Sequence, residues 1–399
     1  MKSPCIAIDV SKASSYIQGF VKIGESISKA IKIKHDKEGY QTIGELTNEI
    51  KAKYGDVTCI FESTGIYHRS LQQFLELANQ KYIILNPLEA AKIRKSSLRS
   101  TKTDKKDCES IAKAYFLNDY RYYKKQDIYY EQLQIMNRYY NFLIKQLRMT
   151  KINFRNQLDI IYPKFDELYD NPYLAVPMAI LSKYPHPELI RKVRLTSIGK
   201  HLMKKTKHRE RYTTLEAKKI KEYCINTQSG CFKESIEVRI LENLIKSIEA
   251  KQNNLNEHIK LMKKSSMNNP FYHQLLTIPG IGENLAVRLI GELGDISRFD
   301  TKRQLVAYAG VDPIVYQSGK MTGEHLHITK KGNKNLRCLL YLAVSANIRM
   351  GKLNPIRNFY NKKKQQDNPL SHKAALIACV NKLLRIIYSM NESGELFHY

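Results

Sequence analysis

Four acidic residues in the first part of the chain have the types and spacing to bind metal ions. Asp9 closes the apolar run "CIAIDV", Glu62 closes the apolar run "VTCIFE", and Asp104 and Asp107 lie three apart in "KTDKKD". The last two therefore share one face of a first helical turn. Four carboxylates in one place repel each other unless cations lie among them. Two Mg²⁺ ions about 4 Å apart, held by such carboxylates, stabilise the attacking and leaving oxygens of a phosphodiester displacement. Taken singly, Asp9 is also a common turn former, and Asp104 and Asp107 suit a helix N-terminus.

A serine and a group of basic residues towards the C-terminus could act on the same phosphate. Ser318 lies in "VYQSGK", and a serine hydroxyl is a poor nucleophile unless it is activated. The stretch "ITKKGNKNLRCLL" places cations around a glycine turn that leads into a helix, which suits the binding of a scissile phosphate. The basic residues predicted to bind nucleic acid are Lys320, Lys330, Lys331, Lys334 and Arg337. A structural serine and a solvated basic loop are the competing interpretations.

The segment "IPGIGENLAVRLIGELG" is typical of a helix-hairpin-helix. Gly280 and Gly282 would let backbone N–H groups approach a phosphate, and the following helix N-terminus favours an anion. Such a motif contacts DNA without reading its sequence. A plain turn between two helices is the alternative.

The composition favours a long polyanion as the partner. The chain has 66 Lys and Arg against 38 Asp and Glu, a formal charge of +28. Seven scattered cysteines without a CxxC pair indicate neither a zinc site nor a disulfide framework, which fits a reduced cytosol. The sequence lacks an apolar run of about 18 residues, so we expect a cytoplasmic protein without a membrane partner. The tyrosine-rich stretch "NDYRYYKKQDIYYEQ" suits either stacking on unpaired bases or an amphipathic helix start.

The elements that must position these residues predict an α/β plus α chain with three domains. Residues 1–124 read as three strands, the third of them "SISKAIKIK" over 26–34, followed by alternating helix and strand, the order of a ribonuclease H-like domain. Residues 125–262 contain two long helices whose apolar spacing predicts a coiled coil, with Gln252 interrupting the second. Between these helices, residues 163–235 form an insert to which the sequence assigns no role. Residues 263–399 are mainly helical and carry the helix-hairpin-helix-like motif and Ser318.

The ordered motifs "AIDVSK", "FESTG", "KTDKKD", "IPGIG", "LVAYAGVDPIVYQSGK" and "ITKKGNKNLRCLL" resemble those of the DEDD-type insertion-sequence transposases, the IS110 family. Piv-type DNA invertases are related to this family. The resemblance covers roughly residues 1–120 and 265–395, and the middle of the chain carries no motif of the family.

The resemblance implies a RuvC-like N-terminal domain whose acidic tetrad binds Mg²⁺ through Asp9, Glu62, Asp104 and Asp107. It also implies that Ser318 is the nucleophile, forming a covalent 5′-phosphoserine link to DNA. The two halves of an active site would come from different subunits of a homo-oligomer, a tetramer. A structured bridge RNA would pair with donor and target DNA and so set the sequence.

Two rival interpretations stay open. In a metal-dependent nuclease or junction resolvase of the RuvC type, water would attack and Ser318 would be a loop residue. In a non-catalytic nucleic-acid-binding protein, the chain would only occupy DNA ends, which an intact tetrad and serine argue against. A covalent protein–DNA adduct separates the recombinase from both.

Overall fold

The computed structural model describes residues 2–63, 65–85, 104–120, 127–314, 317–318, 321–322 and 327–398; for 104–106, 317–318 and 321–322 it describes the backbone alone. The chain forms two compact units, Met1–Lys125 and Gln126–Tyr399. Mixed strands and helices build the first unit and helices dominate the second, which agrees with the predicted α/β plus α class.

A six-stranded sheet forms the centre of the first unit, with the strand order β3-β2-β1-β5-β6 and β4 paired to β2. β1 runs antiparallel to β2 and parallel to β5, and β5 runs parallel to β6. The strands are β1 (Cys5–Val10), β2 (Ser14–Lys22), β3 (Glu25–Ser26), β4 (Ile31–Lys34), β5 (Thr58–Glu62) and β6 (Tyr82–Leu85). The single strand expected over 26–34 is therefore divided into β3 and β4.

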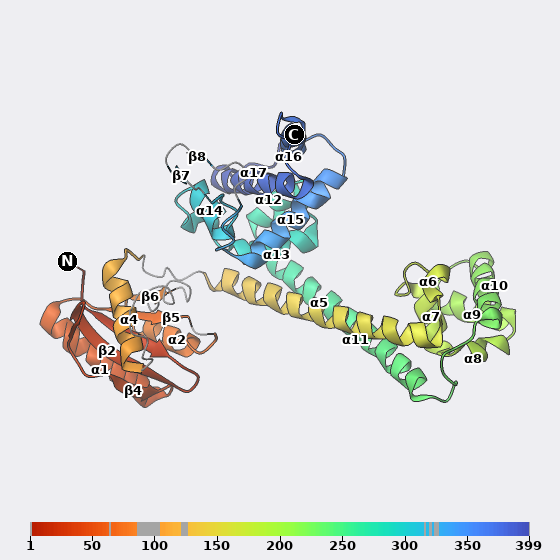
Figure 1. Ribbon diagram of the computed structural model, residues 1–399, viewed down its shortest axis with the longest axis horizontal. Helices are drawn as coiled ribbons and strands as arrows, with labels where there is room; N and C mark the ends of the chain where they lie inside the picture. The colour runs from red at the N-terminus through yellow and green to blue at the C-terminus, as the bar shows by residue number, and fades with distance from the viewer. Residues whose placement is uncertain are drawn as a thin grey trace. The chain divides into compact units, whose positions relative to one another are not determined.

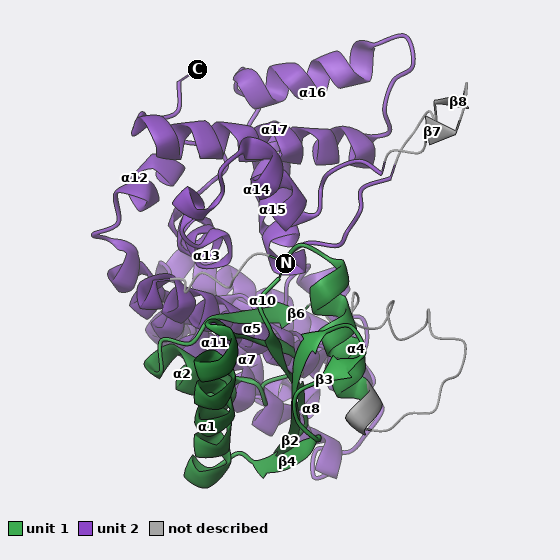
Figure 2. Ribbon diagram, turned by 90° about the vertical axis from the view of Figure 1, so that its left-hand side faces the viewer, with its two compact units in different colours: residues 1–125 green, residues 126–399 purple. Residues whose placement is uncertain are grey.

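Helices cover both faces of this sheet (Figure 2). Alternate residues of β1 point to opposite faces, so Ile6 and Ile8 pack with α1 (Lys37–Tyr54) and α2 (Arg69–Leu77). Cys5 and Ala7 face α4 (Asp104–Leu117). The carboxyl ends of β1 and β5 are thus sandwiched between helices, and α4 lies on the face that the odd-numbered residues of β1 share.

Two long helices, α5 (Ile128–Ile161) and α11 (Ile236–Ser266), pack against each other in the second unit (Figure 1). Their contact uses the apolar positions expected from the sequence. These buried residues include Leu133, Leu143 and Leu147 on α5, and Leu241, Ile245, Ile248, Leu255, Ile259 and Met262 on α11. The apolar residues repeat at helical spacing, so they form one side of each helix, and the two helices pack along these sides.

The insert between these helices folds as five helices around its own hydrophobic cluster. They are α6 (Phe165–Leu168), α7 (Ala175–Lys183), α8 (Pro187–Arg191), α9 (Leu195–Thr206) and α10 (Glu210–Asn226). Ile180, Leu202 and Ile220 are fully buried and pack with Phe154 and Ile161 of α5. The insert is therefore a packed part of the second unit.

The C-terminal part packs around a larger cluster built on α15 and α17. Its elements are α12 (Pro270–Leu276), α13 (Glu283–Leu293), the 3-10 helix η1 (Ile296–Arg298), α14 (Lys302–Ala309), β7 (Gln317–Ser318), β8 (Met321–Thr322), α15 (Lys334–Arg349), α16 (Pro355–Gln365) and α17 (His372–Ser393). Leu133, near the start of α5, belongs to this same cluster. α5 thereby joins the C-terminal helices to the insert.

In the described part of the chain, no helix is long and apolar enough to cross a membrane. All seven cysteines are described, and each is a free thiol.

Candidate functional site

Strand register brings Asp9 and Glu62 to the same edge of the sheet. Ile8 pairs with Phe61 across the parallel strands β1 and β5, so Asp9 and Glu62 are the next residue on each strand. Side chains alternate along a strand, and Glu62 therefore shares the face of Ile60, just as Asp9 shares that of Ala7. Both carboxylates are half-buried.

Helix α4 adds Asp107 to that face. α4 packs on β1, β2 and β5, and its Cys108, Ile111 and Ala112 complete the hydrophobic cluster there. Asp107 lies one turn into the helix, with only 8% of its surface exposed. Three of the four predicted acidic residues therefore lie on one face of one unit, and the fourth, Asp104, begins the same helix although its side chain lies outside the described residues.

Within the described residues, no group of three or more His, Cys, Asp or Glu side chains is gathered closely enough to hold a metal ion. The carboxylates nevertheless offer the hard oxygen ligands that suit Mg²⁺. Asp9, Glu62 and Asp107 each also take part in an interaction within the chain.

Ser318 lies at the end of a short β-ribbon. β7 pairs antiparallel with β8, and Ser318 stands opposite Met321. The ribbon grows from two segments joined by an isolated bridge between Pro313 and Ile328 and by a hydrogen bond from Thr329 N–H to the Asp312 carbonyl at 3.0 Å. The Ser318 side chain and the whole of Lys320 lie outside the described residues.

The base of this ribbon carries the predicted basic residues, and they divide into two kinds. Lys330, Lys331 and Lys334 are exposed. Arg337 is half-buried, and its guanidinium donates to the carbonyls of Ala309 at 2.9 Å and Gly332 at 3.1 Å. The three lysines are therefore available to an anion, whereas Arg337 already joins the end of α14 to the basic loop.

A buried polar chain that sequence reasoning missed supports this loop. Glu292, fully buried on α13, accepts hydrogen bonds at 2.7 Å from the side-chain amides of Asn137 on α5 and Asn333 before α15. Asn333 in turn caps α15 by accepting from the N–H groups of Asn335 and Leu336. The start of α15, which carries Lys334, is thereby anchored to α5.

Arg288 completes the chain. It donates to Asn137 at 3.0 Å and to Asn141 at 2.9 Å, and its guanidinium lies over the Tyr140 ring. Burial lowers the pKa of the Arg288 guanidinium below its ordinary value. Two features of the sequence could have indicated this buried polar chain. Arg288 and Glu292 lie one turn apart in the otherwise apolar helix "AVRLIGEL", and Asn137 lies among the apolar positions of α5.

The two glycines of the helix-hairpin-helix segment have different surroundings. Gly280 has φ +89°, and a Cβ there would lie 2.5 Å from the backbone nitrogen of Asn347 on α15. A Cβ on Gly282 would meet nothing within 4 Å, and this residue begins α13 without a side-chain cap. The close contact with α15 therefore explains why residue 280 is a glycine. Gly282 has no such contact and has open space beside it.

The tyrosine-rich stretch is described only in part, since residues 121–126 lie outside the described residues. Tyr129 and Tyr130, at the start of α5, pack partly buried against the C-terminal cluster. For these two rings the structure favours the amphipathic helix start.

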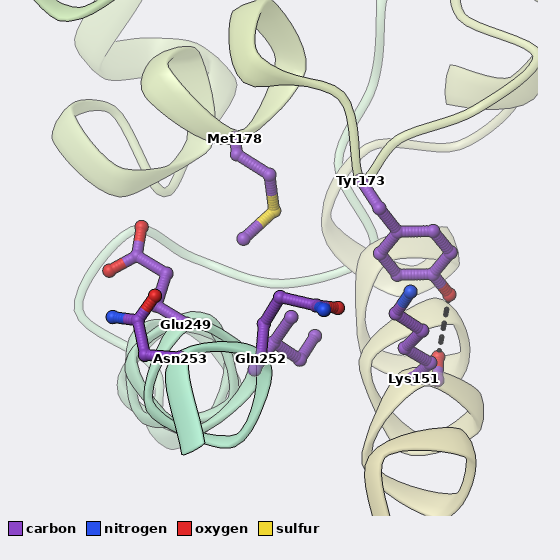
Figure 3. Close-up of a pocket in the computed structure, with 7 residues that line it drawn as sticks. Lys151, Tyr173, Met178, Glu249, Gln252 and Asn253 are labelled. Atoms are coloured by element: carbon purple, nitrogen blue, oxygen red, sulfur yellow. Dashed lines mark hydrogen bonds between the residues drawn. The ribbon is translucent and has the colours of Figure 1, made fainter. Parts of the chain in front are cut away.

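A pocket of about 380 Å³ lies where α5 and α11 meet the insert (Figure 3). Tyr173 donates to the Lys151 carbonyl at 2.9 Å, and the Lys151 ammonium lies 4.4 Å from the Tyr173 ring centre. Gln252, which interrupts the apolar spacing of α11, lines this pocket opposite Met178. None of the predicted site residues lines it.

Comparison with known proteins identifies the class of protein and then the family. A model described as a transposase matches residues 6–163, and a model described as "Transposase IS116/IS110/IS902 family" matches residues 272–361. Together the two models cover more than half of the chain, including both regions that carry the predicted site residues. The protein is a transposase, and it belongs to the IS110 family.

Three similar proteins, from insertion elements or from a DNA inversion system, agree with this family. The chain is 24% identical over 303 residues to the protein of insertion element IS116 from Streptomyces clavuligerus, covering 74% of this chain and 72% of that protein. It is 31% identical over 123 residues to the pilin gene-inverting protein of Moraxella bovis, covering 31% and 37%. It is also 28% identical over 163 residues to the transposase for IS1111A from Coxiella burnetii, covering 40% and 43%.

Proposed function

We propose that this transposase cuts and rejoins the DNA of an insertion sequence, with Mg²⁺ held by Asp9, Glu62, Asp104 and Asp107 and with Ser318 as nucleophile. The observation that carries the proposal is the placement of Asp9, Glu62 and Asp107 on one sheet face in a chain of this family. We also propose that the first unit is RuvC-like, that α5 and α11 form a coiled coil, and that the three-domain division 1–124, 125–262 and 263–399 holds.

A bound Mg²⁺ would neutralise the phosphate and lower the pKa of the attacking hydroxyl. The Ser318 oxygen then attacks the phosphorus, a bond from phosphorus to serine forms, and the bond to the 3′ oxygen breaks. The Ser318 hydroxyl gives up its proton as it attacks, and the departing 3′ oxygen takes up one proton, so the transfer leaves the number of protons unchanged. Lys330, Lys331 and Lys334, exposed at the base of the ribbon, hold the phosphate oxygens by charge.

The covalent link conserves the energy of the phosphodiester bond. A 3′ hydroxyl of the partner DNA end attacks the phosphoserine and releases the Ser318 hydroxyl, so strand exchange needs no ATP. The sequence contains no Walker-type phosphate loop, which agrees with this scheme.

We propose donor DNA, target DNA and a structured bridge RNA as partners, in the cytoplasm. The formal charge of +28 supports a large nucleic-acid surface. Guidance by RNA rests on the family resemblance.

A homo-oligomer is part of the same proposal. Ile128, Ile135, Phe142 and Met149 recur on α5 at intervals of seven residues, and each is about half exposed. This stripe uses other positions of α5 than those that pack on α11, and a heptad stripe of this kind fits a helix of a second copy of the chain.

The test of the nucleophile is retention of label on the protein. Purified protein, Mg²⁺ and RNA transcribed beside the gene are incubated with labelled element-end and target DNA, and the label is followed on a denaturing gel. We expect an adduct with the wild type and with Thr322→Ala, the control on the neighbouring strand, and no adduct with Ser318→Ala.

Rejoined DNA produced by Ser318→Ala would exclude Ser318 as the nucleophile. Cleaved DNA without an adduct in the wild type would favour the alternative, a RuvC-like nuclease or junction resolvase that uses water.

A further inference from the structure

We infer that the turn between α9 and α10, in the insert, is a second surface that binds the phosphate backbone of a nucleic acid. The inference rests on the proposed function for the class of ligand, but it concerns a part of the chain outside both matched regions, 6–163 and 272–361. It gives a role to the insert that the sequence left without one.

The surface, here called the basic turn, combines dense positive charge with exposure. Residues 200–211, "KHLMKKTKHRER", hold six Lys and Arg and one carboxylate, Glu210. All six cations are exposed, and among the described residues none of them forms an ion pair. They are Lys200, Lys204, Lys205, Lys207, Arg209 and Arg211.

The two helices hold the basic turn rigidly. α9 and α10 pack side by side, with Ile198 and Leu202 fully buried against Ala217 and Ile220 (Figure 1). The turn itself, residues 207–209, is short. The cations therefore project from a fixed scaffold, which lowers the entropy that is lost when a backbone is bound.

A solvated helix end explains only some of these charges. Lys204 and Lys205 lie in the last turn of α9, where the helix dipole favours cations. Arg209 and Arg211, by contrast, lie at the N-terminus of α10. Arg209 is the N-cap of α10 and makes no side-chain cap, and Arg211 is in the first turn, where the dipole disfavours positive charge.

Lys207 also occupies a position whose backbone conformation does not favour lysine. It ends α9 at φ +58°, in the left-handed region that favours glycine. Three cations thus occupy positions where glycine, serine or aspartate would make a more stable turn. The uncapped N–H groups of α10 point to the same place, so an arriving phosphate would satisfy both the charges and the helix end.

The charge test uses the full-length protein and its affinity for two probes, a random-sequence DNA duplex and a random-sequence RNA duplex, at several salt concentrations. The variant replaces Lys205, Lys207, Arg209 and Arg211 by Gln. We expect binding of at least one probe to weaken about tenfold or more, and the slope of log affinity against log salt to fall by about 2 to 3. The probe that is affected identifies the nucleic acid.

The matched control removes four exposed lysines from the first unit, Lys29, Lys34, Lys37 and Lys53, also by Gln. It changes the net charge equally. An equal loss in the control, or no loss in the variant for either probe, overturns the inference.

A second pair of substitutions separates binding from folding. Lys207→Gly and Arg209→Ser supply the residues that the local backbone favours, so we expect the double variant to melt at the same or a higher temperature while it binds more weakly. Unchanged affinity with raised stability would make the basic turn a purely structural feature and overturn the inference.

These binding tests are independent of the test of the proposed function. If the proposed function is wrong, the wild-type protein forms no covalent adduct through Ser318. The role of the basic turn depends only on the ratio between variant and wild-type affinities.

Discussion

At the scale of residues, side-chain alternation decides which acidic groups share a face of the sheet. Asp9 and Glu62 end adjacent parallel strands on the face that α4 covers, and Asp107 comes to that face from the helix. The sequence supplied the three residue types and the ends of both strands. The shared face depends on the register between β1 and β5, which joins residues more than 50 positions apart.

Asp9→Asn tests the metal at this scale. We expect Mg²⁺ to raise the melting temperature of the wild type but not of this variant, because a bound ion at 100 times its Kd adds about 2.7 kcal/mol to the folded state. Without Mg²⁺ the variant should be as stable as the wild type or more stable, since repulsion among the carboxylates is relieved.

The control is Asp56→Asn, at the opposite end of β5, where the carboxylate pairs with Lys81 at 2.7 Å. It should keep the response to Mg²⁺. A variant of Asp9 that unfolds at ordinary temperature would instead assign that residue a structural role.

At the scale of elements, backbone contacts decide what each glycine does. Gly280 lets the turn between α12 and α13 lie directly on α15, where Asn347 donates to the Pro279 carbonyl at 2.8 Å. The sequence pattern indicated two equivalent glycines for phosphate binding. The structure separates them because only one of them touches another helix.

Gly280→Ala should lower the free energy of unfolding by about 2 to 4 kcal/mol, through strain at positive φ and overlap with α15. Gly282→Ala should change it by less than about 1 kcal/mol, and it should weaken DNA binding if its backbone approaches a phosphate. Urea unfolding and a DNA titration of both variants measure this. Equal stability of the two variants would contradict the packing role of Gly280.

The buried chain through Glu292 gives a second prediction at this scale. Glu292→Leu removes the acceptor of the Asn137 and Asn333 side-chain amides and the negative charge near the Arg288 guanidinium, so we expect a loss of about 3 kcal/mol in the free energy of unfolding. Urea unfolding measures it. The control is Glu283→Leu on the same helix, an exposed residue paired with Lys263, which should cost less than about 1 kcal/mol.

At the scale of the whole molecule, charge and exposed apolar surface define what the chain associates with. The net charge of +28 suits nucleic acid, and the stripe on α5 suits a second copy. Phe142 of this stripe also stacks on Tyr139, with the ring centres 6.1 Å apart.

Ile135→Glu combined with Phe142→Glu should convert the oligomer that we propose to a monomer with unchanged helix content. Light scattering after gel filtration at high salt, without nucleic acid, measures the mass. Gln132→Glu combined with Gln146→Glu adds the same charge beside the stripe and should leave the oligomer intact. A wild type that is already monomeric under these conditions would contradict the role of the stripe.

The sequence by itself determined the local chemistry and the order of the elements. Residue types, strand and helix periods and turn glycines depend on neighbours in the chain, so the acidic residues, the strands of the first unit and the pairing sides of α5 and α11 could all be predicted. It did not separate the strand expected over 26–34 into β3 and β4.

Only the tertiary structure decided which residues support the site from a distance. One guanidinium nitrogen of Arg337, a residue that we predict to bind nucleic acid, donates to two carbonyls, and Glu292 joins Asn137, 155 positions earlier in the chain, to the cap of α15. Contacts of this kind arise when separate elements pack, and a buried charge is stable only where its partners meet it. Local sequence patterns do not indicate those partners, because they lie far apart in the chain and meet only when it folds.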